Sequence, residues 1–136
     1  MRIMLDTNVL ISAILFQSKD LSRIIEISAE EYNLVLSTYV VDELIMVVNR
    51  KFPDKISAIE KFLTALSFEL TYSPKSYEGV PLFSIRDDKD YMVLYTAIIA
   101  DVDILITGDK DFMGIDIERP EIMIPKDFLL KYDLCN

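Results

Sequence analysis

The chain has 136 residues and carries 23 acidic against 14 basic residues, which gives a net charge of −9. This length is typical of one domain, since domains usually run ~100–200 residues, and a hydrophobic fraction of 51% indicates a packed globule. The sequence has no His, which excludes Ser-His-Asp and Cys-His catalysis. Its one Cys, Cys135, excludes an intrachain disulfide and a cysteine-based zinc site. Any catalysis must therefore use carboxylates, hydroxyls, Lys, Arg or a bound ion.

Targeting signals and membrane segments are not expected. No apolar run is long enough to span a bilayer, and the apolar stretch 9–16 follows Asp6 and Asn8 rather than a basic segment. The single Cys fits a reducing compartment, so we expect a cytoplasmic protein with no membrane partner. The negative charge has the wrong sign for bulk attraction to nucleic acid, so such a role would need local basic residues and a cation.

The first half of the chain alternates short β-rich runs with longer runs at helical spacing. Asp20 is a plausible N-cap of one helix, Ser37 or Thr38 can cap the next, and Pro53-Asp54 begins another. The expected elements, in chain order, are a strand over 2–5, helices over 9–16 and 20–29, a strand over 34–36, a helix beginning at 37 or 38, and a helix over 56–66.

The second half continues the alternation. Ser73-Pro74 and Gly79-Val80-Pro81 indicate a loop, and Gly108 stops the strand before it. The expected elements are a strand over 68–72, a helix over 87–99, strands over 103–107 and 121–124, with Pro125 ending the last strand, and a closing helix over 126–134. Strands separated by helices predict an α/β fold with right-handed crossovers and a mainly parallel sheet of four to five strands. No linker stands out, so residues 1–136 are expected to form a single domain.

Acidic residues follow four of the predicted strands: Asp6, Glu43, the group Asp87, Asp88 and Asp90, and Asp109. Because the carboxyl ends of parallel strands meet at one edge of a sheet, these acids are expected to gather there. Taken singly, each is more often a turn former, a helix cap or a solvated charge. Together they repel one another, and a hard cation such as Mg²⁺ or Mn²⁺ is the obvious compensation. Such a site can orient a phosphate, activate water and stabilise a leaving oxygen.

Four segments resemble, in order, the acidic motifs of the PIN domain family, named for the PilT N-terminus: 5–10 (LDTNVL), 41–44 (VDEL), 87–90 (DDKD) and 106–112 (ITGDKDF). The resemblance continues to 125–128 (PKDF) and is strongest with the toxin subfamily that is similar to VapC toxins. It implies a PIN-like three-layer α/β/α sandwich.

The resemblance also assigns the site, residue by residue. The four metal-binding and catalytic positions match Asp6, Glu43, Asp90 and Asp109. Relatives often have Asp-Pro-x-Asp at the third motif; here Asp88 replaces the Pro, so Asp87 is a further candidate ligand. Asn8 and Thr107 match residues that support the first and last acids, and Asp111 is expected just outside the ligand set.

The implied activity is a Mg²⁺- or Mn²⁺-dependent endoribonuclease, in which a water of lowered pKa attacks the phosphodiester. The implied biology is the toxin of a toxin–antitoxin pair, with an RNA substrate, an antitoxin protein partner and a homodimeric state. Side chains that could bind RNA phosphates are Arg50, Lys51, Arg86, Lys89 and Lys110, and those that could stack on bases are Tyr39, Tyr91 and Tyr95.

Other interpretations remain open. A haloacid-dehalogenase-like phosphatase also has an Asp after its first strand, but it needs a second Asp where this chain has Asn8. A receiver-type domain needs paired acids after the first strand and an acceptor Asp after the third, which 5–7 and 72–74 do not supply. A catalytically silent PIN-like protein that binds RNA or a partner is the remaining alternative.

Overall fold

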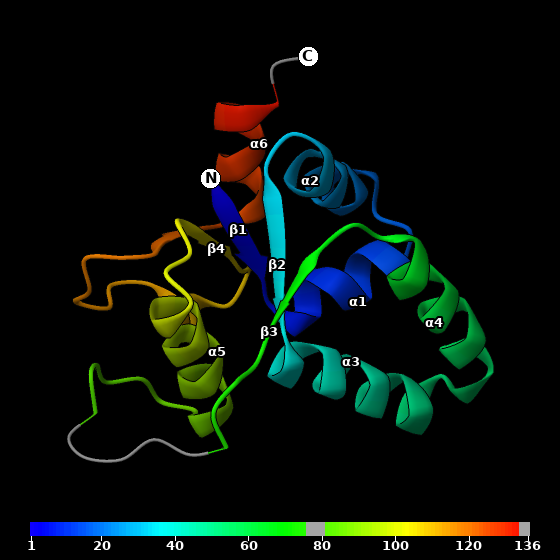
Figure 1. Ribbon diagram of the computed structural model, residues 1–136, viewed down its shortest axis with the longest axis horizontal. Helices are drawn as coiled ribbons and strands as arrows, with labels where there is room; N and C mark the ends of the chain where they lie inside the picture. Colours follow the sequence, from blue (N-terminus) through cyan, green and yellow to red (C-terminus); the bar gives the residue numbers. More distant parts are fainter. Residues whose placement is uncertain (76–80, 134–136) are drawn as a thin grey trace.

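The structure is a computed structural model that describes residues 1–75 and 81–133, and its centre is a parallel sheet (Figure 1). The strands lie in the order β3-β2-β1-β4-β5, and every neighbouring pair is parallel. The predicted parallel sheet is therefore confirmed, with five strands. Their bounds are β1 Arg2–Leu5, β2 Asn33–Ser37, β3 Glu69–Thr71, β4 Ile104–Ile106 and β5 Glu121–Met123.

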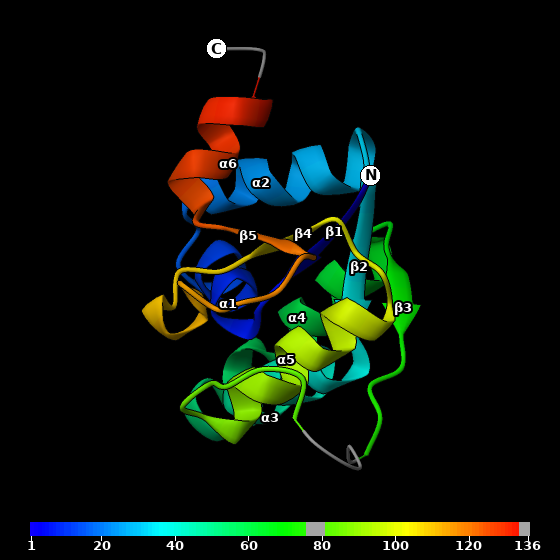
Figure 2. The same ribbon diagram turned by 90° about the vertical axis from the view of Figure 1, so that its left-hand side faces the viewer.

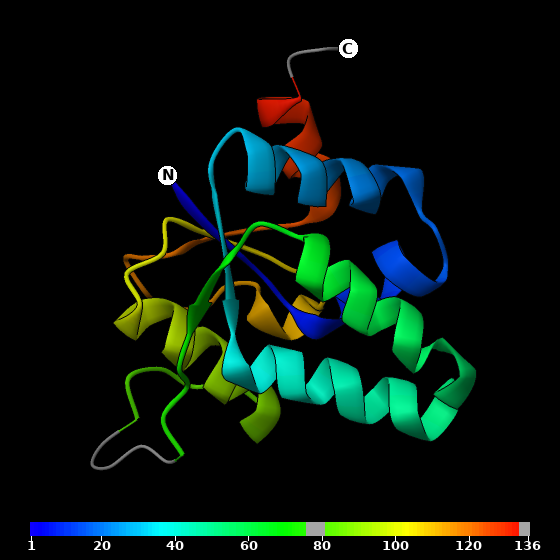
Figure 3. The same cartoon turned by 45° about the vertical axis from the view of Figure 1, so that its right-hand side comes forward.

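Helices cover both faces of the sheet. Their bounds are α1 Thr7–Leu15, α2 Lys19–Glu30, α3 Thr38–Lys51, α4 Ile56–Ala65, α5 Asp88–Ile99 and α6 Pro125–Tyr132, with 3₁₀ turns η1 Pro53–Lys55 and η2 Lys110–Phe112. The connections from β1 to β2 and from β2 to β3 step the same way along the sheet, whereas α5 leads back past β1 to β4. Right-handed crossovers then place α5 on the face opposite α1 to α4. Figures 1 and 3 show this arrangement, which is the expected three-layer α/β/α sandwich.

The inner strands are buried on both faces, which explains why polar and apolar residues do not alternate along them. In β1, Ile3, Met4 and Leu5 are fully buried, and so are Leu105 and Ile106 of β4. Strands covered by helices on both faces are continuous apolar runs, because neither face meets water. The edge strand β3 is shorter than predicted and leaves Leu70 exposed.

Several helices begin at residues other than those predicted, because different residues cap them. The first helix begins at Thr7 rather than at 9, because Asp6 is its N-cap. The second begins at Lys19, and its cap is Ser18 rather than Asp20, which lies in the first turn. The prediction of Ser37 as a cap is confirmed, since its hydroxyl accepts a hydrogen bond from the Val40 backbone N–H.

The C-terminal part differs in two respects. Pro125 was expected to end the last strand, but it is the first residue of α6, where its fixed φ and missing N–H cost nothing. The turn after β4 takes the form of the 3₁₀ turn η2, which was not among the predicted elements. Gly79, Val80, Leu134 and Cys135 lie outside the described residues. Over the described ranges, none of the helices is both long and apolar enough to cross a membrane.

Candidate active site

The sheet reverses its strand order between β1 and β4, and the candidate site lies at the carboxyl ends of these two strands. Leu5 pairs with Ile106, so the residues that follow, Asp6 and Thr107, stand next to each other. The Asp6 backbone N–H continues the ladder by donating to the Ile106 carbonyl at 3.2 Å. Such a reversal leaves a crevice beyond the strand ends, which is where open α/β sheets bind ligands.

Thr107 links the first and last acidic motifs. Its hydroxyl is buried, donates a hydrogen bond to Asp6 Oδ2, and accepts one from the Asp109 backbone N–H at 3.1 Å. The other carboxylate oxygen of Asp6, Oδ1, accepts from the Val9 backbone N–H at 3.0 Å, as the N-cap of α1. The position of the Asp6 carboxylate is thus set by groups on both sides of it.

The turn η2 brings a second acid beside Asp109. Asp109 Oδ1 accepts a hydrogen bond from the Asp111 backbone N–H at 2.9 Å, which caps this turn. Asp90 comes from a different connection, in the first turn of α5. Asp90, Asp109 and Asp111 each offer a carboxylate oxygen, and these atoms lie within 4.8 Å of one another. We call these three residues the acidic cluster.

The charges of the cluster oppose one another. Burial, and then the charges of Asp109, Asp87 and Asp111, raise the pKa of Asp90 to about 7. Burial likewise raises the pKa of Asp6, although its hydrogen bonds to Thr107 and Val9 act in the opposite direction. The fold therefore maintains carboxylates where their ionised form is disfavoured. Three oxygen donors of this kind suit a hard divalent cation, which would favour the ionised form.

The start of α3 borders the same crevice. The pKa of Tyr39 is raised by burial and by the nearby charges of Glu43, Asp87 and Asp90. Glu43 lies on the second turn of α3 and is half-buried. The structure thus brings Glu43 near the acids, although the three converging carboxylates do not include it.

The third motif offered several candidate ligands, and the structure separates their positions. Asp87 is exposed, and its Oδ1 accepts from the Lys89 backbone N–H at 2.9 Å as the N-cap of α5. Asp88 is exposed as well, whereas Asp90 belongs to the acidic cluster. Asp111 was expected just outside the ligand set but contributes an oxygen to the cluster. The Asp-Lys-Asp spacing after Gly108, typical of an Asx turn, was the signal for this.

The predicted RNA-binding side chains divide into two groups. Arg86 is 88% exposed, and its Nε lies 3.9 Å from Asp111 Oδ2, while Lys89 and Lys110 are exposed neighbours of cluster residues. Arg50 and Lys51 are exposed in the last turn of α3, which is roughly 10 Å along the helix from Glu43. Arg86 therefore lies at the cluster, Lys89 and Lys110 are adjacent to cluster residues in the chain, and Arg50 and Lys51 lie at the far end of α3.

The remaining candidates have other surroundings. Tyr91 is buried and packs between Phe83 and Tyr95, with ring centroids 4.4 Å and 5.7 Å away, so it is a core residue. Its hydroxyl accepts from the Leu82 backbone N–H at 3.1 Å. Asn8 is exposed, and it is its backbone N–H that lies close to Asp6.

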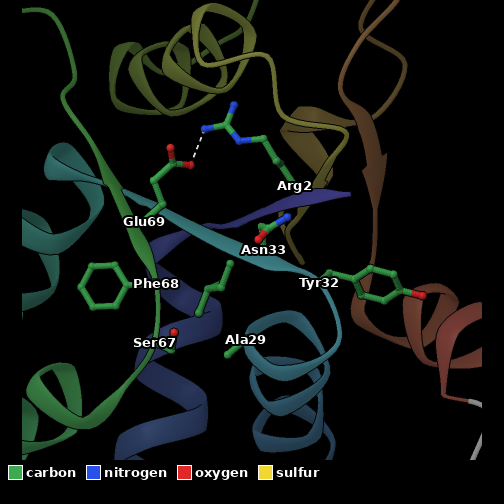
Figure 4. A pocket seen from close by; sticks show the side chains of 8 residues that line it. Arg2, Ala29, Tyr32, Asn33, Ser67, Phe68 and Glu69 are labelled. Carbon is green, nitrogen blue, oxygen red and sulfur yellow. Dashed lines mark hydrogen bonds and ion pairs between the residues drawn. The ribbon is translucent and has the colours of Figure 1, made fainter.

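A separate hollow of about 370 Å³ lies at the amino ends of β1, β2 and β3 (Figure 4). An ion pair between Arg2 and Glu69 crosses it, and the Arg2 guanidinium also donates to the Ala100 carbonyl. These contacts pair the two charged side chains that line the hollow, Arg2 and Glu69.

Comparison with solved structures shows the same fold. A chain in the structure of VapBC2 from Rickettsia felis bound to a promoter DNA fragment is 17% identical, with a TM-score of 0.68 over 91% of this chain and 98% of that one. A chain of VapBC-1 from nontypeable Haemophilus influenzae is 19% identical, with a TM-score of 0.64 over 93% and 99%. Mycobacterium tuberculosis VapC20, a sarcin-ricin loop cleaving toxin, is 12% identical, with a TM-score of 0.56 over 87% and 98%.

A search of curated proteins found no matching sequence. The family model described as PIN domain matches residues 2–111, which span every acid of the crevice from Asp6 to Asp111. This match covers most of the chain, and it agrees with the sheet order and with the acids at the strand ends. The chain therefore belongs to the PIN domain family.

Proposed function

We propose that this protein is a metal-dependent endoribonuclease and the toxin of a toxin–antitoxin pair. The observation that carries the proposal is the convergence of Asp90, Asp109 and Asp111 within 4.8 Å, at the point where the strand order reverses. Two of the three carboxylates come from the connection after β4, and the third comes from the start of α5.

The residues of the site would have different roles in metal binding, positioning and proton transfer. Asp90, Asp109 and Asp111 would hold one Mg²⁺ or Mn²⁺ ion, with Asp6, Glu43 and Asp87 as further acids near it. The cation, when bound, supplies Lewis acidity that lowers the pKa of a water and offsets phosphate charge. Thr107 fixes the relative positions of Asp6 and Asp109. The sequence has no His, and the carboxylates beside the cation would accept the proton of the attacking water.

The substrate and partner follow from charge and from the structural neighbours. Arg86 lies beside the cluster, and Lys89 and Lys110 are exposed and adjacent in sequence to its members, so all three can offer positive charge to RNA phosphates. One neighbour is a sarcin-ricin loop cleaving toxin, and others come from VapBC complexes, which supports RNA as the substrate and an antitoxin as the partner. A homodimer is the proposed oligomeric state.

The test is a cleavage assay on mixed RNA with Mg²⁺ or Mn²⁺, repeated with excess chelator. We expect cleavage by the wild type with metal, and none by Asp109→Asn. The matched control is Asp54→Asn, which removes the same charge from exposed η1 and should cleave like the wild type. Equal cleavage by wild type and Asp109→Asn, or cleavage that survives the chelator, would contradict the proposal. A protein that binds RNA without cleaving it would instead be the catalytically silent alternative.

A further inference from the structure

A groove of about 620 Å³ lies next to the acidic cluster. One wall is the segment that leads into α5, and the other is the segment after η2; Figure 2 shows the two on the same side of the molecule. Its volume falls within the ~300–1,000 Å³ that is usual for small-molecule sites. The lining residues are Leu82, Phe83, Ser84, Ile85, Arg86, Asp111, Met113, Gly114, Ile115 and Asp116.

The groove is continuous with the acidic cluster. Asp111 belongs to both, since it lines the groove and gives an oxygen to the cluster. Arg86 stands at the same junction, with its Nε 3.9 Å from Asp111 Oδ2. The rest of its guanidinium is exposed, and it has five N–H donors. An anionic group at the cluster would therefore meet a cationic donor at the entrance of the groove.

The walls of the groove combine apolar side chains with polar and charged ones, and one wall is anchored to the core. Phe83 is only 8% exposed and stacks on Tyr91 at 4.4 Å, which anchors this wall to the core. Leu82 is 57% exposed and Met113 is 40% exposed, so apolar surface remains accessible to a ligand at the rim. Gly114, at a φ of +74°, turns the opposite segment and brings no side chain of its own into the groove.

We propose that this groove binds the nucleobase next to the scissile bond, with Arg86 on the adjoining phosphate. The inference rests on the ribonuclease function proposed above. A nucleotide carries an anionic phosphate and, joined to it by the sugar, a flat base with apolar faces and polar edges. The same order of features runs from the cluster through Arg86 into the groove, whose lining has both apolar and polar side chains. Base contact with apolar and aromatic side chains is sequence-tolerant. A paired base is not available for it, so the groove selects an unpaired nucleotide.

The test asks whether removing the base and changing the groove affect the same interaction. A single-stranded RNA with one cleavage site is compared with the same RNA carrying an abasic nucleotide next to that site, and kcat/KM is measured for both. Wild type should lose about 10-fold on the abasic RNA, because a stacked base contributes that order of binding. Met113→Ala should be slower on intact RNA, and its loss on abasic RNA should be much smaller. The control is Leu130→Ala, which shortens a 76% exposed apolar side chain on α6 and should keep the full 10-fold loss.

The outcomes separate this inference from the proposed function. Metal-dependent cleavage with an abasic loss that Met113→Ala reduces supports both. Metal-dependent cleavage with equal abasic losses in wild type and Met113→Ala overturns the groove assignment alone and leaves the groove as a surface for a protein partner. No metal-dependent cleavage of the intact RNA overturns both.

Discussion

The Thr107 hydroxyl donates to the carboxylate of Asp6, a residue that lies 101 positions earlier in the chain. The same hydroxyl accepts from the Asp109 backbone N–H, so one buried oxygen connects the ends of β1 and β4. In a low-dielectric site, such a shared group makes the positions of the two acids interdependent. Changes at Thr107 should therefore affect the acids as a unit.

Thr107→Val keeps the shape of the side chain but removes both hydrogen bonds. We expect a loss of roughly 1–3 kcal/mol in the free energy of unfolding, because Asp6 and the Asp109 N–H lose a partner. Cleavage should fall by at least about 10-fold, because misplaced acids stabilise the transition state less well and a rise of about 1.4 kcal/mol in the activation free energy already slows a reaction that much. Urea denaturation and kcat/KM measure the two effects. Thr107→Ser, which keeps the hydroxyl, should resemble the wild type; a valine variant as active as the serine variant would contradict the positioning role.

Asp6→Asn should abolish metal-dependent cleavage without unfolding the protein. The Asp6 carboxylate is buried and its pKa is raised, so its charge opposes folding. In the Asn variant the amide oxygen can still accept from the Val9 backbone N–H, and the amide NH2 can donate to the Thr107 hydroxyl. The melting temperature in chelator should be equal to or above that of the wild type. Unchanged RNA cleavage by the purified variant would refute a role for Asp6 in the chemistry.

The two acids at the ends of the third motif should respond differently. Asp87→Ala removes the N-cap of α5 and should cost about 1 kcal/mol of stability, whereas Asp87→Asn should cap nearly as well. Asp90→Asn should leave the cap intact and abolish cleavage, because it removes a member of the acidic cluster. If Asp87→Asn loses activity as fully as Asp90→Asn, Asp87 is a ligand and the cap is its minor role.

Without metal, Asp90 should make stability fall as the pH rises. Between its usual pKa of 3.8 and the raised value of about 7, the native protein retains a proton that the unfolded chain has lost. The native state then binds more protons than the unfolded state, so this contribution to the free energy of unfolding is greatest below pH 4 and is lost as the pH approaches about 7. Urea midpoints in chelator at pH 5, 6, 7 and 8 are the measurement.

Asp90→Asn should flatten that profile. Asp54→Asn changes the net charge equally and should retain the wild-type slope, which separates the local effect of Asp90 from general repulsion in an acidic protein. A slope that is the same in all three proteins would show that Asp90 has no special part in it.

Mg²⁺ or Mn²⁺ should stabilise the wild type. A ligand that binds only the native state at ten times its Kd adds about 1.4 kcal/mol, which corresponds to a few degrees in Tm for a domain of this size. The shift should disappear in Asp109→Asn and Asp111→Asn and persist in Asp54→Asn. Ca²⁺-free buffer with chelator gives the baseline. A wild-type Tm that does not move at millimolar metal would count against the site.

Most of the fold could be predicted from local patterns. The apolar runs of β1 and β4 are buried on both faces, and a run of that kind is visible in a sequence without knowledge of its neighbours. The element boundaries that were predicted wrongly lie where two local signals are about equally strong. Ser18 and Asp20 are both good N-caps, and only the path of the chain into α2 decides between them. Pro125 can end a strand or begin a helix. In the structure it begins α6, which packs beside α2.

By itself, the sequence determined that acids follow the strands of a parallel sheet and that chemistry without His must depend on them, because residue identity and strand polarity are local properties. Which carboxylates converge was decided by tertiary structure. Asp90 and Asp111 meet Asp109 because α5 and η2 reach the reversal in strand order from different connections, while Asp87 turns back to cap its own helix. Distances between side chains on separate connections depend on crossover geometry and on hydrogen bonds such as that from Thr107 to Asp6, and no spacing along the chain encodes them.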